Sequence, residues 1–310
     1  MEKNSKIYVA GHRGLVGSAI VRELEKKGYA NIVRRTHTEL ELMDPVAVRD
    51  FFASEKPEYV FLAAARAGGI MANNKFPADF IHENLLVQTN VLHEAHASGV
   101  KKLLFPGSSC IYPRLAPQPI KEEYLLTGPL EETNSAYAIA KIAGIETCQA
   151  YHRQYGSNFI SVMPTNLYGP NDNFSPERSH VLPALLRRFH EAKKTGAESV
   201  TVWGTGAPRR EFLHVDDLGS ACVFLMETYD DPSIINIGTG EDITIKELAE
   251  LIARTVGYEG KIVWDTSKPD GTPQKKLSVE KIQGLAWHYS IPLPEGLAST
   301  YEWFVKNATS

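Results

Sequence analysis

Short apolar runs alternate along this chain with longer stretches whose apolar residues recur at helical spacing. Gly, Pro or small polar residues follow each short run, and this punctuation is typical of buried strands. The expected strands cover residues 7–10, 31–37, 59–65, 101–105, 159–163, 201–204 and 234–238. The expected helices end near Lys27 or cover residues 45–55, 78–98, 137–155, 181–194 and 215–226. This alternation predicts an α/β fold with a doubly wound parallel sheet.

The pattern becomes less regular after residue 169, where a polar stretch follows the fifth strand of the expected sheet. Loops are expected at residues 113–129, 171–179 and 207–212. The run at 234–238 would return the chain to the sheet. We therefore expect a nucleotide-binding domain and a smaller α/β substrate-binding lobe, built from residues 1–169 with 214–240 and from residues 170–213 with 241–310, respectively.

The composition excludes several classes of protein. Of 310 residues, 43% are hydrophobic, and the net charge of −4 gives no support for a nucleic-acid partner. The first residues are polar, and no apolar run approaches the roughly 18 residues that span a bilayer. Cys110, Cys148 and Cys222 are widely spaced and match neither a disulfide framework nor a metal site. We expect a reduced, cytoplasmic protein that holds no metal.

A glycine-rich turn, Gly11-x-x-Gly14-x-x-Gly17, follows the first expected strand and opens the first helix. Glycines at this spacing allow a tight turn and close approach of the backbone to a pyrophosphate, which the helix N-terminus favours. An ordinary strand–helix turn is the alternative, but the context favours a dinucleotide site. The residues expected to bind the cofactor here are Gly11, Arg13, Gly14, Leu15, Val16 and Gly17.

The end of the second expected strand indicates which dinucleotide is bound. An NAD site would place an acidic residue there for the ribose 2′-hydroxyl, and none is present. Arg34 and Arg35, with Arg13 from the turn, suit a 2′-phosphate instead. The alternative is a solvated strand end. We expect NADP as the cofactor.

Ser108, Tyr137 and Lys141 suggest carbonyl reduction. Ser108 follows a buried strand, where open α/β sheets bind ligands. Tyr137 and Lys141 are four residues apart and share a helix face, so the ammonium should lower the tyrosine pKa and make it usable as an acid or base. Cys110 is an unusual neighbour of Ser108, and a buried filler is its alternative role. The Asn166 amide could hydrogen-bond substrate or cofactor, and a simple turn-former is its alternative role. Arg188, Trp203 and Arg210 are candidate ligand contacts, although each type is more often packing or surface.

These motifs resemble those of the GDP-L-fucose synthase family of extended short-chain dehydrogenases/reductases. The resemblance runs nearly end to end and includes residues 9–14, 107–113, 137–144, 164–170, 179–181, 210–217 and 268–273. It implies a Rossmann-like fold, an NADPH-dependent 3,5-epimerisation and 4-keto reduction of GDP-4-keto-6-deoxy-D-mannose, and a homodimer through the helices at 78–98 and 137–155. It also implies Tyr137 as the reductive proton donor and Cys110 and His180 as the epimerisation pair.

The same resemblance extends the two binding sets. The further cofactor contacts that it implies are Lys141, Pro164, Asn166, Leu167 and His180, and the substrate contacts are Asn166, Arg188, Trp203, Arg210 and Lys268. The chain departs from the family at His37 and Gln274, where Arg is usual, and at Ser278, where an acidic residue usually contacts the sugar nucleotide.

Three other functions are alternatives to the one that the resemblance implies. A 4,6-dehydratase would need an acidic pair where Ser109 and Cys110 stand, so we set it aside. A C4 reductase or epimerase/reductase acting on a related GDP-4-keto sugar, such as a colitose or modified heptose precursor, stays open. A non-catalytic NADP-binding regulator would tolerate loss of the Tyr137 and Lys141 pair, and both residues are present.

Overall fold

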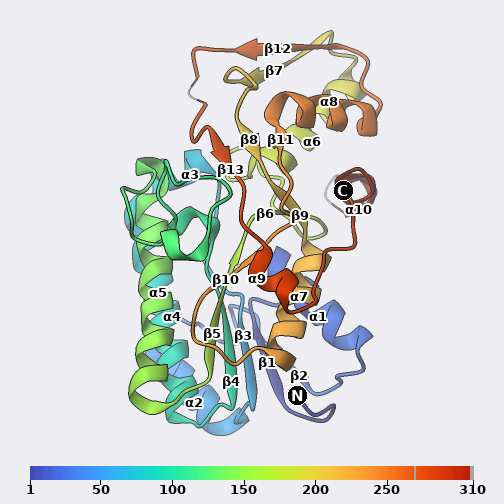
Figure 1. Cartoon of the computed structure of the whole chain (residues 1–310). Helices are drawn as coiled ribbons and strands as arrows, with labels where there is room; N and C mark the ends of the chain where they lie inside the picture. The colour runs from blue at the N-terminus through green and yellow to red at the C-terminus, as the bar shows by residue number, and fades with distance from the viewer. Residues whose placement is uncertain (269, 308–310) are drawn as a thin grey trace.

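A six-stranded parallel sheet forms the centre of the computed structural model, which describes residues 1–268 and 270–307 (Figure 1). Its order is β10-β5-β4-β3-β1-β2, so the chain leaves β1 toward β2 and later returns to the other side of β1. The strands are β1 (Ile7–Ala10), β2 (Ile32–Val33), β3 (Tyr59–Leu62), β4 (Lys102–Pro106), β5 (Phe159–Pro164) and β10 (Ile235–Ile237). The expected doubly wound α/β class is confirmed.

Helices cover both faces of this sheet because its strands are apolar on both sides. Tyr8 and Ala10 of β1 belong to the core beneath one layer of helices, whereas Ile7 and Val9 belong to the core beneath the other. The first layer contains α2 (Pro45–Glu55), α4 (Pro77–Ala97) and α5 (Ser135–Tyr155), and the second contains α1 (Leu15–Lys26) and α7 (Val215–Thr228). None of the described helices has the length and apolar character needed to cross a bilayer.

A third core lies beyond the carboxyl ends of the sheet strands, at the top of Figure 1. Phe189, Leu248, Ile252, Leu297 and Phe304 are buried in it. Its elements are α6 (Val181–Thr195), β7 (Ser199–Trp203), α8 (Ile245–Val256), β12 (Lys261–Asp265) and α10 (Leu293–Asn307). A capping box between Thr244 and Glu247 begins α8, and Gly257 in the left-handed region ends it.

Short strands and turns connect the third core to the sheet. They are β6 (Asn166–Tyr168), β8 (Arg209–Arg210), β9 (Phe212–His214), β11 (Ile243–Thr244), β13 (Gln274–Lys275), α3 (Ile70–Lys75), α9 (Glu280–Gly284) and the 3₁₀ turns at Ser109–Ile111, Glu122–Tyr124 and Glu132–Asn134. The expected loop at 207–212 is wrong, because β8 pairs with β11 and β13 while β9 pairs with β6. The expected strand at 31–37 is too long, because pairing with β1 covers Ile32 and Val33 alone.

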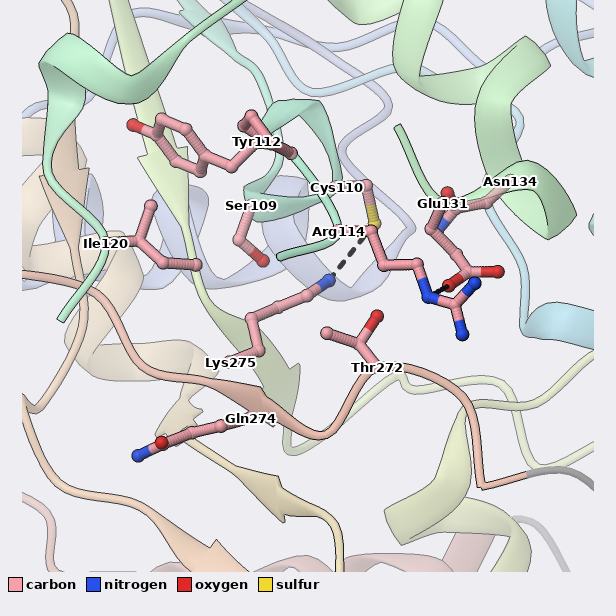
Figure 2. A pocket seen from close by; sticks show the side chains of 11 residues that line it. Ser109, Cys110, Tyr112, Arg114, Ile120, Glu131, Asn134, Thr272, Gln274 and Lys275 are labelled. Carbon is pink, nitrogen blue, oxygen red and sulfur yellow. Dashed lines mark hydrogen bonds and ion pairs between the residues drawn. The ribbon is translucent and has the colours of Figure 1, made fainter. Parts of the chain in front are cut away.

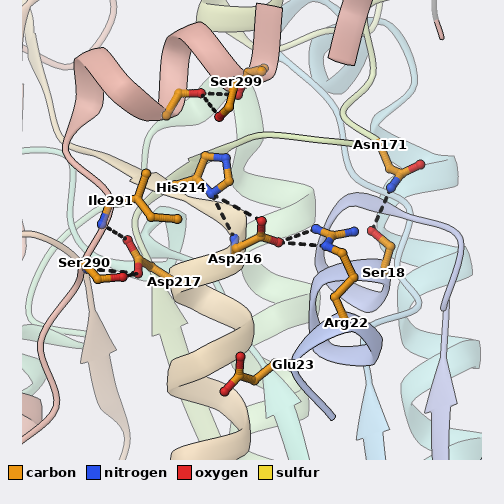
Figure 3. A network of polar contacts seen from close by, with 12 residues as sticks. Ser18, Arg22, Glu23, Asn171, His214, Asp216, Asp217, Ser290, Ile291 and Ser299 are labelled. Atoms are coloured by element: carbon orange, nitrogen blue, oxygen red, sulfur yellow. Dashed lines mark hydrogen bonds and ion pairs between the residues drawn. The ribbon is translucent and has the colours of Figure 1, made fainter. Parts of the chain in front are cut away.

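A polar network ties α7 to two other segments (Figure 3). Arg22 of α1 donates from Nε to Asp216 Oδ1 at 2.9 Å, and the Asp216 amide donates to His214 Nδ1 at 3.2 Å. Asp217 accepts from the amides of Ser290 and Ile291 at 3.0 and 2.9 Å. The start of α7 therefore joins α1 to the chain that leads into α10.

Candidate active site

The glycine turn is shaped by steric contacts that exclude side chains. A Cβ at Gly17 would lie 2.2 Å from the Gly11 carbonyl oxygen, and one at Gly11, where φ is +77°, would lie 2.8 Å from the Ala64 backbone. Gly14 caps α1 without a side-chain hydrogen bond, which leaves first-turn amides available to a ligand. His12 Nδ1 is buried without a hydrogen-bond partner among the described residues. This cradle fits a dinucleotide phosphate.

The two arginines after β2 differ in how they are held. Arg34 is exposed and pairs with Glu25, whereas Arg35 pairs with Glu55 and lies 5.8 Å from the Phe51 ring centroid. The charges of Arg13 and Arg34 both lower the pKa of His12, after desolvation as the main cause, so these two guanidiniums lie near the turn. His37 pairs with Glu41 at 2.8 Å.

Ser108 and Cys110 lie just beyond the carboxyl end of β4. Ser108 has extended backbone and begins the 3₁₀ turn at Ser109–Ile111, and its Oγ accepts a hydrogen bond from the Cys110 amide at 3.2 Å. This bond holds the turn that presents the thiol. Cys110 is half-buried and is a free cysteine in a cleft lined in part by Arg114, Glu131 and Lys275 (Figure 2).

Tyr137 and Lys141 lie on α5 as expected, but their electrostatics differ from the expectation. Burial raises the pKa of Tyr137, with the Cys110 charge adding to this and a hydrogen bond to Ser108 opposing it. Lys141 donates to the Pro106 carbonyl at 2.8 Å, and burial lowers its pKa to about 8. The expected lowering of the tyrosine pKa is wrong for this structure, because desolvation is the main cause of the shift and the ammonium lies 5.9 Å from the ring centroid.

The Lys275 charge acts on both His180 and Cys110. His180 precedes α6 as its N-cap residue. Its surface is exposed, yet surrounding protein displaces part of its hydration and lowers its pKa, and the Lys275 charge adds to this shift. Lys275 also lies 3.7 Å from the Cys110 sulfur. No spacing signal predicted this contact, since the two residues are 165 positions apart in the sequence.

Arg188, Trp203 and Lys268 come together, whereas Arg210 lies closer to the thiol. The Arg188 guanidinium and the Lys268 ammonium each lie 5.6 Å from the Trp203 ring centroid, and this indole is 43% exposed. Burial lowers the pKa of Arg210, while the charges of Cys110 and Asp270 oppose that shift. Among the motif residues 268–273, Pro269 lies outside the described residues.

The remaining predicted contacts have mixed surroundings. Pro164 ends β5 and is buried, while Asn166 and Leu167 are half-buried on β6. Asn166 Nδ2 already donates to the Glu211 carbonyl at 2.8 Å. Gln274 donates to Asp242 at 2.6 Å. Ser278 is 6% exposed and bonded to the Ile120 backbone, so the change at this position falls in the core rather than on an accessible surface.

The buried carboxylate of Glu211 holds the backbone of the site, and the sequence motifs did not predict this role. Its carboxylate is fully buried and accepts backbone hydrogen bonds from Thr239 and Gly240 at 2.6 and 2.8 Å and from Leu277 at 2.8 Å. Burial raises its pKa, and these bonds oppose that shift. Its own amide donates to the Lys275 carbonyl at 3.3 Å. Glu211 therefore fixes the strand that carries Lys275.

Comparison with known proteins agrees with this geometry. Residues 7–238 match the NAD dependent epimerase/dehydratase family, and the chain belongs to it. GDP-L-fucose synthase 1 of Arabidopsis thaliana is 62% identical over 306 residues, covering 99% of this chain and 95% of that protein. This relative confirms the resemblance to the GDP-L-fucose synthase family that the motifs indicate.

Solved structures match over the whole fold. A GDP-6-OMe-4-keto-L-xylo-heptose reductase from C. jejuni has a TM-score of 0.94 and 42% identity, covering 99% of each chain. A GDP-L-fucose synthetase from Naegleria fowleri bound to NADP has a TM-score of 0.92 and 31% identity, covering 100% of this chain and 97% of that one. Within the described residues no cluster of His, Cys, Asp and Glu side chains could hold a metal ion.

Proposed function

We propose that the chain is an NADP-dependent oxidoreductase with epimerase activity that converts GDP-4-keto-6-deoxy-D-mannose to GDP-L-fucose. The reaction inverts C3 and C5 and reduces the C4 ketone. The observation that carries the proposal is the thiol of Cys110 beside Ser108 and Tyr137 at the carboxyl end of β4. The near-full-length relative named GDP-L-fucose synthase supports the choice of substrate.

The cradle of Gly11 and Gly17 fits the cofactor pyrophosphate, because a side chain at either position would fill it. Arg13 and Arg34 are the better partners for the 2′-phosphate. The exposed pair of Arg34 with Glu25 is weak and exchangeable, whereas Arg35 is half-buried against Phe51 and Glu55. When bound, NADPH supplies the hydride for C4.

Epimerisation needs a base on one face of the sugar and an acid on the other. The C4 ketone acidifies the C–H bonds at C3 and C5, and Cys110 and His180 are the pair that would exchange these protons. A hydrogen bond from Ser108 would stabilise the enolate oxygen that forms between the two transfers.

Reduction needs a proton donor at the C4 oxygen. Because burial raises the pKa of Tyr137, its hydroxyl keeps its proton at neutral pH and is in the donating form. Lys141, whose ammonium donates a hydrogen bond to the Pro106 carbonyl, would orient the nicotinamide ribose. Bound substrate and cofactor would change the solvation of both residues.

The third core and the strands beside it would form the substrate lobe, with residues 170–213 and 241–310 on the sugar-nucleotide side. The exposed face of Trp203 suits a guanine base, and its neighbours Arg188 and Lys268 suit a diphosphate. Arg210, near the Cys110 sulfur, would contact the part of the substrate closest to the reacting sugar.

The test is NADPH oxidation with GDP-4-keto-6-deoxy-D-mannose, with the stereochemistry of the product determined by NMR. GDP-L-fucose is the expected product. A D-configured 6-deoxy sugar as product would indicate a C4 reductase without epimerase activity. That second function has its own support, since the heptose reductase from C. jejuni shares the fold at a TM-score of 0.94. Turnover of a GDP-4-keto-heptose in preference to the deoxy sugar would favour it.

The family resemblance also suggests a cytoplasmic homodimer. Helices α4 and α5 pack side by side in the outer layer, where Ile139 and Tyr155 of α5 are 48% and 54% exposed. These two helices are the proposed interface. Light scattering should give twice the chain mass at micromolar concentration, and a monomeric mass would overturn the assignment.

A further inference from the structure

The Cys110 thiol has a charged partner that comes from a distant part of the chain. Lys275 extends from β13 into the cleft, and its Nζ donates a hydrogen bond to Cys110 Sγ at 3.7 Å (Figure 2). Both residues line the same cleft. An ammonium in contact with a sulfur favours the thiolate over the thiol.

The position of Lys275 is fixed by backbone pairing. β13 runs parallel to β8 with Lys275 opposite Arg210. The Lys275 carbonyl accepts from the Glu211 amide, and the Glu211 carboxylate accepts from the Leu277 amide two residues further on. The backbone that carries the ammonium is therefore held on both sides of Lys275, so a short reach of its side chain places the charge at the sulfur.

Other charged groups around Cys110 are less suited to this role. The Arg114 guanidinium is paired with Glu131 at 3.2 Å, so its charge is largely neutralised. Arg210 is near enough to sense the Cys110 charge, and Tyr137 on α5 is an uncharged neighbour at neutral pH. His180 has a pKa lowered in part by Lys275. Lys275 is the cation that the structure places in hydrogen-bond contact with the thiol.

We propose that Lys275 is a positioning residue that holds Cys110 as a thiolate for proton transfer at C3 and C5 of the sugar. This proposal deepens the proposed function and rests on Cys110 acting in epimerisation. The same ammonium disfavours a charged His180, so it biases which member of the pair begins as the base. It serves the epimerisation half of the reaction rather than hydride transfer.

The first test measures the thiol directly, without substrate. The rate of alkylation by iodoacetamide is followed against pH for wild type, Lys275→Met, Lys275→Arg and Lys276→Met. Cys148 and Cys222 are buried, so the reaction reports on Cys110, and Cys110→Ser gives the background. Lys276→Met is the matched control, because it removes a positive charge one residue away from Lys275. The Lys276 charge acts on Asp242.

Lys275→Met should move the midpoint of the alkylation profile to higher pH, because the ammonium that contacts the sulfur is gone. Lys275→Arg and Lys276→Met should keep the wild-type midpoint. An unchanged midpoint in Lys275→Met, or an equal shift in Lys276→Met, would overturn the proposal. Circular dichroism and NADPH titration establish that each variant is folded, and Lys275→Gln replaces the Met variant if that one is not.

The second test follows deuterium entering C3 and C5 of the keto sugar in D₂O with NADP⁺ bound, so that epimerisation proceeds without reduction. Lys275→Met should exchange more slowly than wild type at pH 7 and should approach the wild-type rate at higher pH. A constant deficit at all pH values would indicate a structural defect and reject the proposal. Wild-type protein that exchanges no deuterium would instead reject the proposed function, while the alkylation profiles still decide whether Lys275 stabilises the thiolate.

Discussion

The glycine turn and the Cys110 cleft are assembled in opposite ways. The turn lies within seven consecutive residues, 11–17, and its shape follows from backbone contacts between Gly11 and Gly17. The cleft brings Lys275 to Cys110 and the Arg114–Glu131 pair, which lie in a much earlier segment of the chain. A site that consists of backbone can be encoded locally, whereas a site that consists of side-chain charges depends on how the whole sheet is paired.

The two regions should also respond differently to substitution. The chemistry of the turn is steric, so a change there should damage binding and folding together. The chemistry of the cleft is electrostatic, so a change there should remove one proton transfer and leave the fold intact. Two variants test this separation, and a third tests a buried carboxylate outside both regions; they follow from the largest expected effect to the smallest.

Cys110→Ser should lower deuterium exchange at C3 and C5 by about 10²–10⁴, the range for loss of a general acid or base. NADPH affinity and unfolding temperature should stay at wild-type values, because Cys110 is half-buried and its amide, rather than its sulfur, bonds to Ser108. NMR of the sugar and fluorescence titration of NADPH measure the two properties. A parallel loss of NADPH binding would show that the cleft and the turn are not separable.

Gly17→Ala should weaken both properties at once. The added methyl would lie 2.2 Å from the Gly11 carbonyl oxygen, and overpacking of this kind costs about 1–3 kcal/mol. We expect roughly tenfold weaker NADPH binding, equivalent to about 1.4 kcal/mol, and a lower unfolding temperature. Gly284→Ala is the control, since nothing lies within 4 Å of its added methyl. Normal NADPH binding by Gly17→Ala would remove the steric account of the turn.

Asp172→Asn tests a buried carboxylate in the segment that follows Gly169, whose carbonyl accepts from the Asp172 amide. Burial raises the pKa of Asp172 from 3.8 to about 7, and its Oδ2 is buried without a partner among the described residues. Between these values the native state binds the extra proton, so stability falls as pH rises from about 4 to 7. The variant should therefore unfold at a higher temperature than wild type at pH 8 and at about the same temperature at pH 4.

The matched control for that measurement is Asp231→Asn. Hydrogen bonds from the Ser233 hydroxyl and amide lower the pKa of Asp231, so its charge stabilises the native state above its unfolded pKa. Asp231→Asn should lose stability at pH 8 and little at pH 3. If both variants changed the unfolding temperature at pH 8 in the same direction, burial would not be what destabilises the Asp172 charge.

Much of the sheet could be predicted from sequence because its signals are local. Asp44 and Pro45 marked the start of α2, and the Asp44 side chain accepts from the amides of Val46 and Ala47. Strand ends were less accurate, since the end of β2 depends on its partner β1. β8 and β13 were missed because two-residue strands leave no periodicity, and their pairing is decided by segments far apart in the chain.

The candidate site was likewise predictable where its signals are local and not where they depend on distant segments. Ser108, Tyr137 and Lys141 were found because their spacing is meaningful on a strand end and a helix. The electrostatics of Tyr137 were not found, since burial depends on neighbours such as Phe80, whose ring packs edge-on at 6.2 Å. The contact of Lys275 with Cys110 gave no local signal. The roles of these residues in catalysis stay predictions until the variants are measured.

The buried carboxylate of Glu211 has a consequence for the motions of the molecule. It is the common acceptor for the amides of Thr239, Gly240 and Leu277, which belong to two separate segments. Freeing any one of these amides requires water to reach a carboxylate that is fully enclosed. Their hydrogen–deuterium exchange should therefore occur in one shared opening event. In that event the strand bearing Lys275 would separate from Cys110, so the same opening that exposes these amides would also withdraw the ammonium from the thiol.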